Sequence, residues 1–143
     1  MDNFEVIVEK LIKLQQYIDQ IEKIKPSRYE NYISEIIVKY AVERIMQLIV
    51  DIALDINNIL LAYNNKPPAP DYYNSFIEVA ECGVFDSGFA ISIAPSTGLR
   101  NRLVYEYEKV SDEIVFNSIS KFINLYKKYI SMVFKYIEGH KAI

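Results

Sequence analysis

The apolar positions of the chain follow a helical repeat from its start. Between Asn3 and Ile24, apolar residues stand three and four positions apart, at Phe4, Ile7, Leu11, Leu14, Ile18 and Ile21. This spacing puts them on one stripe of an amphipathic helix, which is typical of a helix that packs on a core through one face. Pro26 disfavours helical dihedral angles in the residue before it, so the helix is predicted to end near Lys25.

The second segment, residues 29–63, is predicted to be a long helix with a possible break near Tyr32. Apolar residues cover most of the circumference of its second half, and the polar residues there are confined to one strip: Arg44, Gln47, Asp51, Asp55 and Asn58. A helix that is apolar on so many sides is buried on more than one side. In a domain of this size, the helix would contact its own core and a second copy of the chain, so we expect a homodimer.

The rest of the chain is predicted to form three more helices and one irregular stretch. Asp71 is a suitable N-cap for a short helix, whereas residues 84–95 are expected to form a helical turn and a packed loop. The next helix is predicted over residues 97–109. The last helix is predicted to start at Ser111, another N-cap residue, and to end at Gly139.

These elements predict an all-α fold, an up-and-down bundle of four to five helices in a single domain over residues 1–143. Hydrophobic residues make up 51% of the chain and charged residues 24%, which suits a globular domain. No apolar run approaches the roughly 18 residues of a membrane span. The acidic start, residues 1–5, lacks a signal-peptide pattern. We therefore expect a cytoplasmic protein with no membrane contact.

The cysteine and histidine content limits the possible metal chemistry. Cys82 and His140 are the only residues of their types, so an internal disulfide and a structural Cys/His zinc site are excluded. The chain also lacks a Glu-x-x-His pair, which a di-metal helical bundle would need. Gly-rich phosphate loops and the Gly-x-Ser-x-Gly motif are missing as well. We expect no metal and no cofactor.

The charge of the chain is small overall but uneven. The net charge of −3 argues against a generic nucleic-acid-binding protein. From Lys121 to the end, however, there are five lysines and one Glu, and Lys121, Lys128 and Lys135 recur every seven residues, so they share one helical face. This face is interpreted either as a plain solvated surface or as a strip that guides phosphates.

The stretch from residue 98 to 110 carries the candidate chemistry. Arg100 has a planar guanidinium that suits bidentate binding of phosphate. On an ideal helix, Arg100 and Tyr107 share a face, whereas Tyr105 lies well round the helix. These groups converge only if the helix end distorts or a second subunit closes the site. The polar strip of the second segment is a further source of groups for this site, since Asp51 and Asp55 are one turn apart and point the same way.

The stretch Arg100-Asn101-Arg102-Leu103-Val104-Tyr105-Glu106-Tyr107 resembles a known signature when it is aligned by Arg100. The signature belongs to the HepT-like branch of the HEPN (higher eukaryotes and prokaryotes nucleotide-binding) domain superfamily: Arg, commonly Asn, three residues, His, one residue, Tyr. Arg100 and Asn101 match, Tyr105 stands at the His position, and Tyr107 matches the final Tyr. Residues 41–58 and 70–84 resemble the family's second helix and middle segment, so the similarity covers roughly residues 38–120.

The resemblance implies the toxin of a toxin–antitoxin pair, a metal-independent endoribonuclease that acts on RNA. It implies that Arg100, with Asn101, binds the scissile phosphate, and that the residue at position 105 moves protons during attack by the 2′-hydroxyl. It also implies a partner, a minimal nucleotidyltransferase antitoxin of the MntA type, that silences the toxin by AMPylation of Tyr107.

The cleft for this chemistry is expected to lie between two subunits, with the polar strip of the second segment along its wall. The residues expected to line it are Arg44, Asp51 and Asp55. The alternative interpretation, that Asp51 and Asp55 only form a solvated stripe of the helix, remains open.

Position 105 separates two functional hypotheses. A His with an ordinary pKa of about 6.5 accepts a proton at neutral pH, whereas a Tyr with an ordinary pKa of about 10 stays protonated and is a poor base. The first hypothesis is an active ribonuclease. The second is a catalytically weak or inactive protein of the same fold that serves as partner or substrate of a nucleotidyltransferase. A third, an unrelated helical adaptor, would make the three matching segments coincidental.

Overall fold

The computed structural model describes residues 2–106 and 109–141, and these form seven helices and no strand. The helices are α1 (Asn3–Ile24), α2 (Tyr29–Ser34), α3 (Ile36–Tyr63), α4 (Tyr72–Glu81), α5 (Ser87–Ile93), α6 (Ser96–Tyr105) and α7 (Asp112–Lys141). The prediction of an all-α fold is confirmed.

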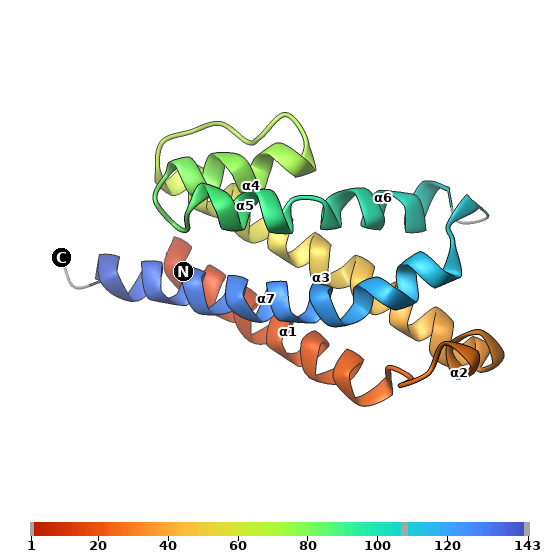
Figure 1. Cartoon of the computed structure of the whole chain (residues 1–143). Helices are drawn as coiled ribbons and strands as arrows, with labels where there is room; N and C mark the ends of the chain where they lie inside the picture. The colour runs from red at the N-terminus through yellow and green to blue at the C-terminus, as the bar shows by residue number, and fades with distance from the viewer. Residues whose placement is uncertain (1, 107–108, 142–143) are drawn as a thin grey trace.

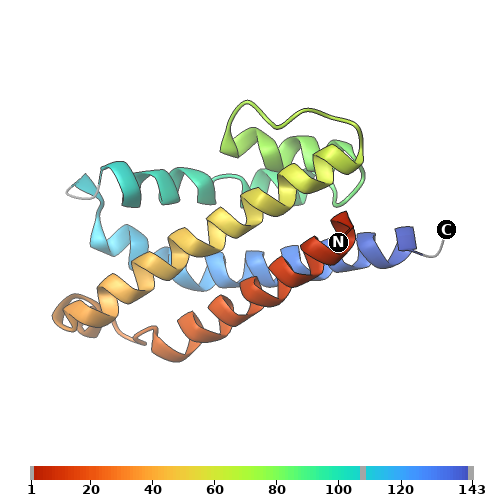
Figure 2. The same cartoon turned by 180° about the vertical axis from the view of Figure 1, so that it is seen from behind.

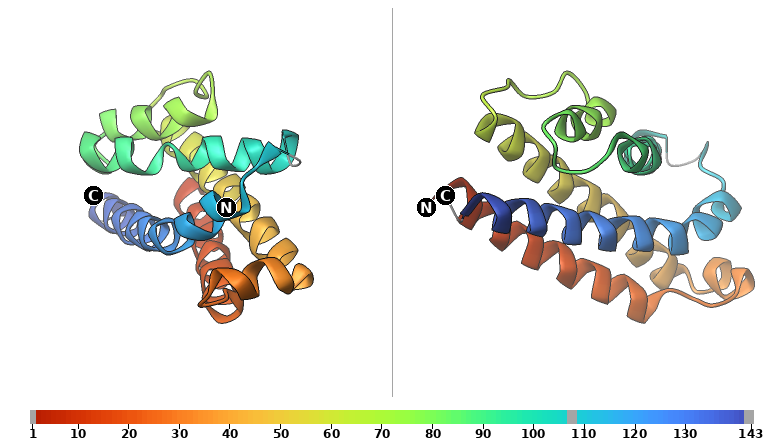
Figure 3. Two further views of the ribbon diagram at one scale, coloured as in Figure 1. Left: turned by 45° about the vertical axis from the view of Figure 1, so that its right-hand side comes forward. Right: turned by 60° about the vertical axis from the view of Figure 1, so that its left-hand side comes forward.

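The long elements alternate in direction, which confirms the predicted up-and-down bundle (Figure 1). Seen from behind, α1 and α3 run side by side (Figure 2). The helices α4, α5 and α6 cross one side of α3 and α7, and α2 lies at one end of the bundle (Figure 3). The structure exceeds the predicted four to five helices because α2 separates from α3 and because α5 is a helix of its own.

One hydrophobic core runs through the bundle, and the apolar stripe of α1 enters it as predicted. Ile7, Leu14, Ile18 and Ile21 are fully buried. The helix α3 supplies the largest share of the core, and by length and composition it is also apolar enough to cross a membrane. Half of its most apolar window is buried inside the protein, as in the core helix of a bundle.

The predicted ends of α2, α6 and α7 each differ from the structure by a few residues. The break between α2 and α3 falls at Glu35, where ψ of 79° leaves the helical region, and not near Tyr32. Tyr32 instead lies inside α2 and is fully buried, with its hydroxyl donating to Glu43 Oε2 at 3.2 Å. At the other end of the chain, α7 continues through Gly139 to Lys141.

The last turn of α7 has side-chain support that its sequence pattern does not reveal. His140 Nδ1 lies 2.7 Å from the carbonyl oxygen of Tyr136, and the two rings stack with centroids 4.0 Å apart. Tyr63, at the end of α3, contacts both rings edge-on. Because these contacts hold the backbone in place, the flexibility of Gly139 does not end the helix.

Hydrogen bonds between buried polar side chains connect three helices inside the core. The Tyr129 hydroxyl on α7 donates to Asn57 Oδ1 on α3 at 2.6 Å, and Asn57 Nδ2 donates to Ser75 Oγ on α4 at 3.0 Å. Ser75 Oγ in turn donates to the carbonyl oxygen of Tyr72 at 2.8 Å. This chain of bonds fixes the start of α4 relative to α3 and α7.

We expect Tyr129→Phe to lower the free energy of unfolding by about 1–3 kcal/mol, because it leaves a buried Asn57 oxygen without its donor. Urea denaturation followed by circular dichroism measures the change. Tyr73→Phe is the matched control, since Tyr73 is 43% exposed and its loss of a hydroxyl leaves stability unchanged. Equal midpoints for the two variants would contradict the role assigned to the buried network.

Candidate functional site

Arg100 lies on α6 where this helix crosses α3, and it forms an ion pair with Asp51. Arg100 Nε donates to Asp51 Oδ1 at 2.8 Å. The Arg100 side chain is 13% exposed and that of Asp51 is 38% exposed, so the pair sits at the edge of the solvent. The bond joins residues 49 positions apart in the sequence and gives the guanidinium a fixed orientation.

The ring of Tyr72 covers the guanidinium from the side of α4. Arg100 Cζ lies 5.3 Å from the centroid of this ring, which is within the range of a cation–π contact. Asp71 holds the backbone here, since its carboxylate accepts from Asn74 N at 2.7 Å as the N-cap of α4. The N-cap at Asp71 was predictable from the sequence, whereas the contact of Tyr72 with Arg100 was not.

Asn101 and Tyr105 surround Arg100 on the solvent side of α6. Arg100 Nη1 donates to Asn101 Oδ1 at 3.2 Å. Tyr105 is 76% exposed and is the last residue of the helix, so its hydroxyl is accessible to a large ligand. Burial of Arg100 disfavours its charged form and lowers its pKa. The hydrogen bond to Asp51, the negative charge of Asp51 and the Tyr105 hydroxyl have the opposite effect, and together they raise the pKa of Arg100 above its ordinary value.

Of the three residues predicted to line the cleft, only Asp51 contacts Arg100 in the structure. Asp55, one turn from Asp51, turns towards α1 and lies 3.5 Å from Lys10 Nζ. Arg44 lies two turns before Asp51 and donates to Gln47 Oε1 at 3.2 Å. Asp51 is therefore the carboxylate that contacts Arg100, while Asp55 and Arg44 lie further along the exposed face of α3.

Tyr107 falls outside the described residues. The helix predicted over residues 97–109 ends earlier than expected, because Glu106 has φ of −128° and ψ of 35°. Tyr107 follows the end of α6 by two residues, so its placement on one face with Arg100 stays a prediction.

This arrangement can bind an anion without a metal ion. A guanidinium has five N–H donors. The bonds to Asp51 and Asn101 use two of them, so donors remain for the Tyr105 hydroxyl and for a phosphate oxygen. Within residues 2–106 and 109–141, no group of three or more His, Cys, Asp or Glu side chains is placed to hold a metal ion.

Three comparisons with known proteins agree on one group of relatives. A family model described as "Ribonuclease HepT-like" matches residues 14–133. The tRNA nuclease HepT of Aphanizomenon flos-aquae (strain 2012/KM1/D3) is 33% identical over 139 residues, which is 96% of this chain and 95% of that protein.

Solved structures with the same fold include toxin–antitoxin complexes. One is the tri-AMPylated HEPN toxin of Shewanella oneidensis in complex with an MNT antitoxin, with a TM-score of 0.81 and 16% identity over 93% of this chain and 98% of that one. Another is a toxin–antitoxin structure with AMP-PNP, with a TM-score of 0.82 and 16% identity over 90% of this chain and 97% of that one.

Proposed function

Because this chain belongs to the ribonuclease HepT-like family, we propose that it is the toxin of a HEPN–MNT toxin–antitoxin pair and a cytoplasmic endoribonuclease. The observation that carries the proposal is the Arg100–Asp51 pair. It presents an oriented guanidinium at the solvent edge, next to the exposed hydroxyl of Tyr105. The relative named as a tRNA nuclease supports RNA, and transfer RNA in particular, as the substrate.

In the proposed reaction, Arg100 binds the oxygens of the scissile phosphate and stabilises the negative charge that grows on them during attack by the 2′-hydroxyl. Asp51 and Asn101 keep the guanidinium in position. Tyr105 donates its phenolic proton to the leaving 5′-oxygen and thereby acts as a general acid. The proton of the attacking 2′-hydroxyl passes to a water molecule, and the products are a 2′,3′-cyclic phosphate and a free 5′-hydroxyl.

A second candidate function follows from the residue at position 105. A tyrosine there donates a proton but is a poor acceptor, so the site lacks an efficient base for the 2′-hydroxyl. The same fold would then serve as a weakly active or inactive partner and substrate of a nucleotidyltransferase. In both cases the partner is a nucleotidyltransferase, as the toxin–antitoxin structures with this fold support.

We expect the chain to cleave transfer RNA in the presence of excess chelator, because Arg100 and Tyr105 supply the charge and the proton. We also expect Tyr105→His to accelerate cleavage by about 10-fold or more, since general acid–base groups contribute roughly 10²–10⁴-fold. Gel electrophoresis of labelled RNA measures both. Tyr73→His, a change at an exposed tyrosine on α4, is the control. If neither the original chain nor Tyr105→His cleaves RNA, the second candidate function replaces the first.

We further propose that the chain forms a homodimer through the exposed face of α3. Ile37 is 81% exposed and Tyr40 50% exposed, and the face of α3 to which they belong continues through Arg44 and Leu48 to the Asp51–Arg100 pair. A dimer formed here would bring two Arg100 sites together.

Light scattering at micromolar concentration should give at least twice the mass of 16.7 kDa for the original chain. Ile37→Glu should reduce this mass to that of the monomer, because it puts a charge into an apolar contact. Ile12→Glu, on the exposed side of α1, is the control. A monomer at this concentration for the original chain would refute the dimer.

A further inference from the structure

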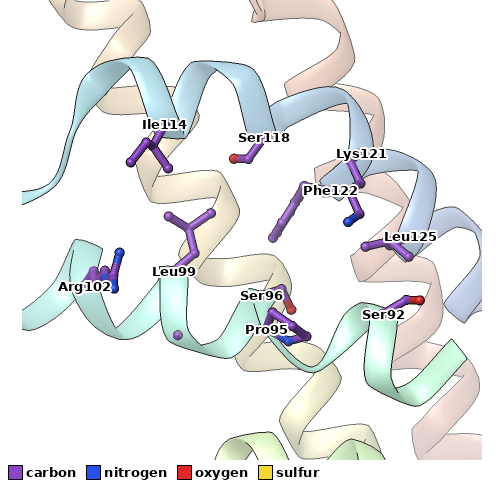
Figure 4. A pocket seen from close by; sticks show the side chains of 11 residues that line it. Ser92, Pro95, Ser96, Leu99, Arg102, Ile114, Ser118, Lys121, Phe122 and Leu125 are labelled. Atoms are coloured by element: carbon purple, nitrogen blue, oxygen red, sulfur yellow. The ribbon is translucent and has the colours of Figure 1, made fainter. Parts of the chain in front are cut away.

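A pocket of about 380 Å³ lies between α6 and the first half of α7 (Figure 4). The α6 residues that line it lie on the opposite side of this helix from Arg100, as their helical spacing requires. Its floor is apolar and is formed by Leu99, Phe122 and Leu125. Arg102 stands towards one end and Lys121 towards the other (Figure 4). The volume lies in the range of roughly 300–1,000 Å³ that is usual for small-molecule sites.

The charge around the pocket is positive, although the chain is acidic overall. Among the described residues, none that lines the pocket is acidic, and neither Arg102 nor Lys121 belongs to an ion pair. Glu106 borders a neighbouring depression with Arg102, and its backbone N–H donates to the Arg102 carbonyl oxygen at 2.9 Å, but the two side chains form no ion pair. The pocket therefore favours an anion with an apolar part.

A row of lysines continues from the pocket along α7. Lys121, Lys128 and Lys135 are exposed, and their seven-residue spacing puts them about 10.5 Å apart along one face of the helix. Between Ile114 and Ile137, α7 has no Asp or Glu. A row of this length fits a polyanion better than it fits a single small anion.

The pocket and the Arg100 site are connected over the outer surface of α6. Around this helix, Asn101 and Tyr105 lie on the solvent side between Arg100 and Arg102. A strand whose phosphate is bound at Arg100 can therefore pass Tyr105 and reach Arg102 and the pocket without crossing the core.

We propose that this pocket binds one nucleotide of the RNA strand next to the cleavage point, an inference that rests on the proposed ribonuclease function. The base contacts the apolar floor at Leu99 and Phe122, and the phosphates on either side of it meet Arg102 and Lys121. The strand then continues along Lys128 and Lys135. Apolar contact with the base combined with a basic track is the general pattern of single-strand binding.

Gly98 allows a sharp test because it lines the pocket and a Cβ at this position would meet no atom within 4 Å. Gly98→Met should fill the pocket without moving the backbone, and Gly98→Ala is its matched control. Both are made in the full chain with Arg100→Ala, so that the RNA is not cut. Fluorescence anisotropy measures binding of a labelled single-stranded oligoribonucleotide. We expect Gly98→Met to weaken binding by about 10-fold and Gly98→Ala to leave it unchanged.

The two cations are tested separately through the salt dependence of binding. Arg102→Ala and Lys121→Ala should each lower the slope of log affinity against log salt by about 0.7, the value for one phosphate contact on a single strand. Lys13→Ala, an equal change of charge on α1, should leave the slope unchanged. Circular dichroism and thermal melting confirm that each variant is folded.

Equal RNA affinity of Gly98→Met and Gly98→Ala overturns the pocket proposal, and so does a lack of RNA binding by the parent chain. If Gly98→Met loses binding of the nucleotidyltransferase but keeps that of RNA, the pocket belongs to the protein partner and the proposal also fails. If RNA binding depends on Gly98 while the original chain cleaves nothing, the pocket stands and the ribonuclease function falls.

Discussion

Replacing Arg100 with Ala is expected to reduce the rate of RNA cleavage by about 10²–10³-fold, the usual effect of removing one group that stabilises charge in a transition state. In the structure, Asp51 and Asn101 orient this guanidinium next to the exposed Tyr105 hydroxyl. Alanine removes both the charge and the N–H donors, so the scissile phosphate loses its main contact. Single-turnover cleavage of transfer RNA measures the effect, and growth of cells that express the chain gives a second readout.

Two further variants show whether the loss is specific. Arg100→Lys keeps the charge but loses the planar pair of donors, so it should recover only a small part of the rate. Arg28→Ala removes an exposed arginine that pairs with Glu30 far from the site, and it should cleave like the original chain. Undiminished cleavage by Arg100→Ala would remove Arg100 from the mechanism.

Incubation with its nucleotidyltransferase, ATP and Mg²⁺ is expected to add one or more AMP units of about 329 Da to Tyr107 and to stop cleavage. A phenol is a workable nucleophile when the partner activates it: its oxygen attacks the α-phosphorus of ATP, and pyrophosphate leaves with the phenolic proton passing to a base. Tyr107 is two residues past Tyr105, which limits their separation to about 7 Å. The added phosphate therefore introduces negative charge within two positions of Tyr105 along the chain, and it is expected to repel the phosphates of RNA there.

Peptide mass spectrometry locates the modified residue. The same Tyr→Phe change at a different position of the chain serves as the control. Tyr107→Phe should remain unmodified and should keep its cleavage activity in the presence of the partner. Tyr73→Phe, at an exposed tyrosine on α4, should be modified and silenced like the original chain. Modification that persists in Tyr107→Phe, or that maps only to Tyr105, would show that the target is another residue.

The helical parts of the fold were predictable where one local signal dominates. The three- and four-residue spacing of α1 and the N-cap at Asp71 act within a few residues, and the structure has both as predicted. The break at Glu35 was not predictable in this way. It depends on the burial of Tyr32 against Phe116, a contact between residues more than 80 positions apart.

The site shows the same division between local and distant effects. The periodicity of α3 puts Asp51 and Asp55 on one face, so it cannot choose between them. The crossing of α6 over α3 decides which carboxylate contacts Arg100. It brings Arg100 to Asp51, whereas Asp55 forms an ion pair with Lys10 on α1. The contact of Tyr72 with Arg100 depends on the position of α4, which the buried hydrogen bonds of Ser75 set.

The pairing of Arg100 with Asp51 also determines which anions the site tolerates when no RNA is present. A guanidinium that already shares its charge with a neighbouring carboxylate gains little from chloride or inorganic phosphate, since each must compete with an anion that is covalently part of the protein. A polynucleotide avoids this competition because its other phosphates bind elsewhere on the surface, and each contact raises the effective concentration of the next. The Asp51 carboxylate thus lowers the affinity of Arg100 for small anions more than its affinity for a polynucleotide, so small phosphates in the cell do not occupy the site.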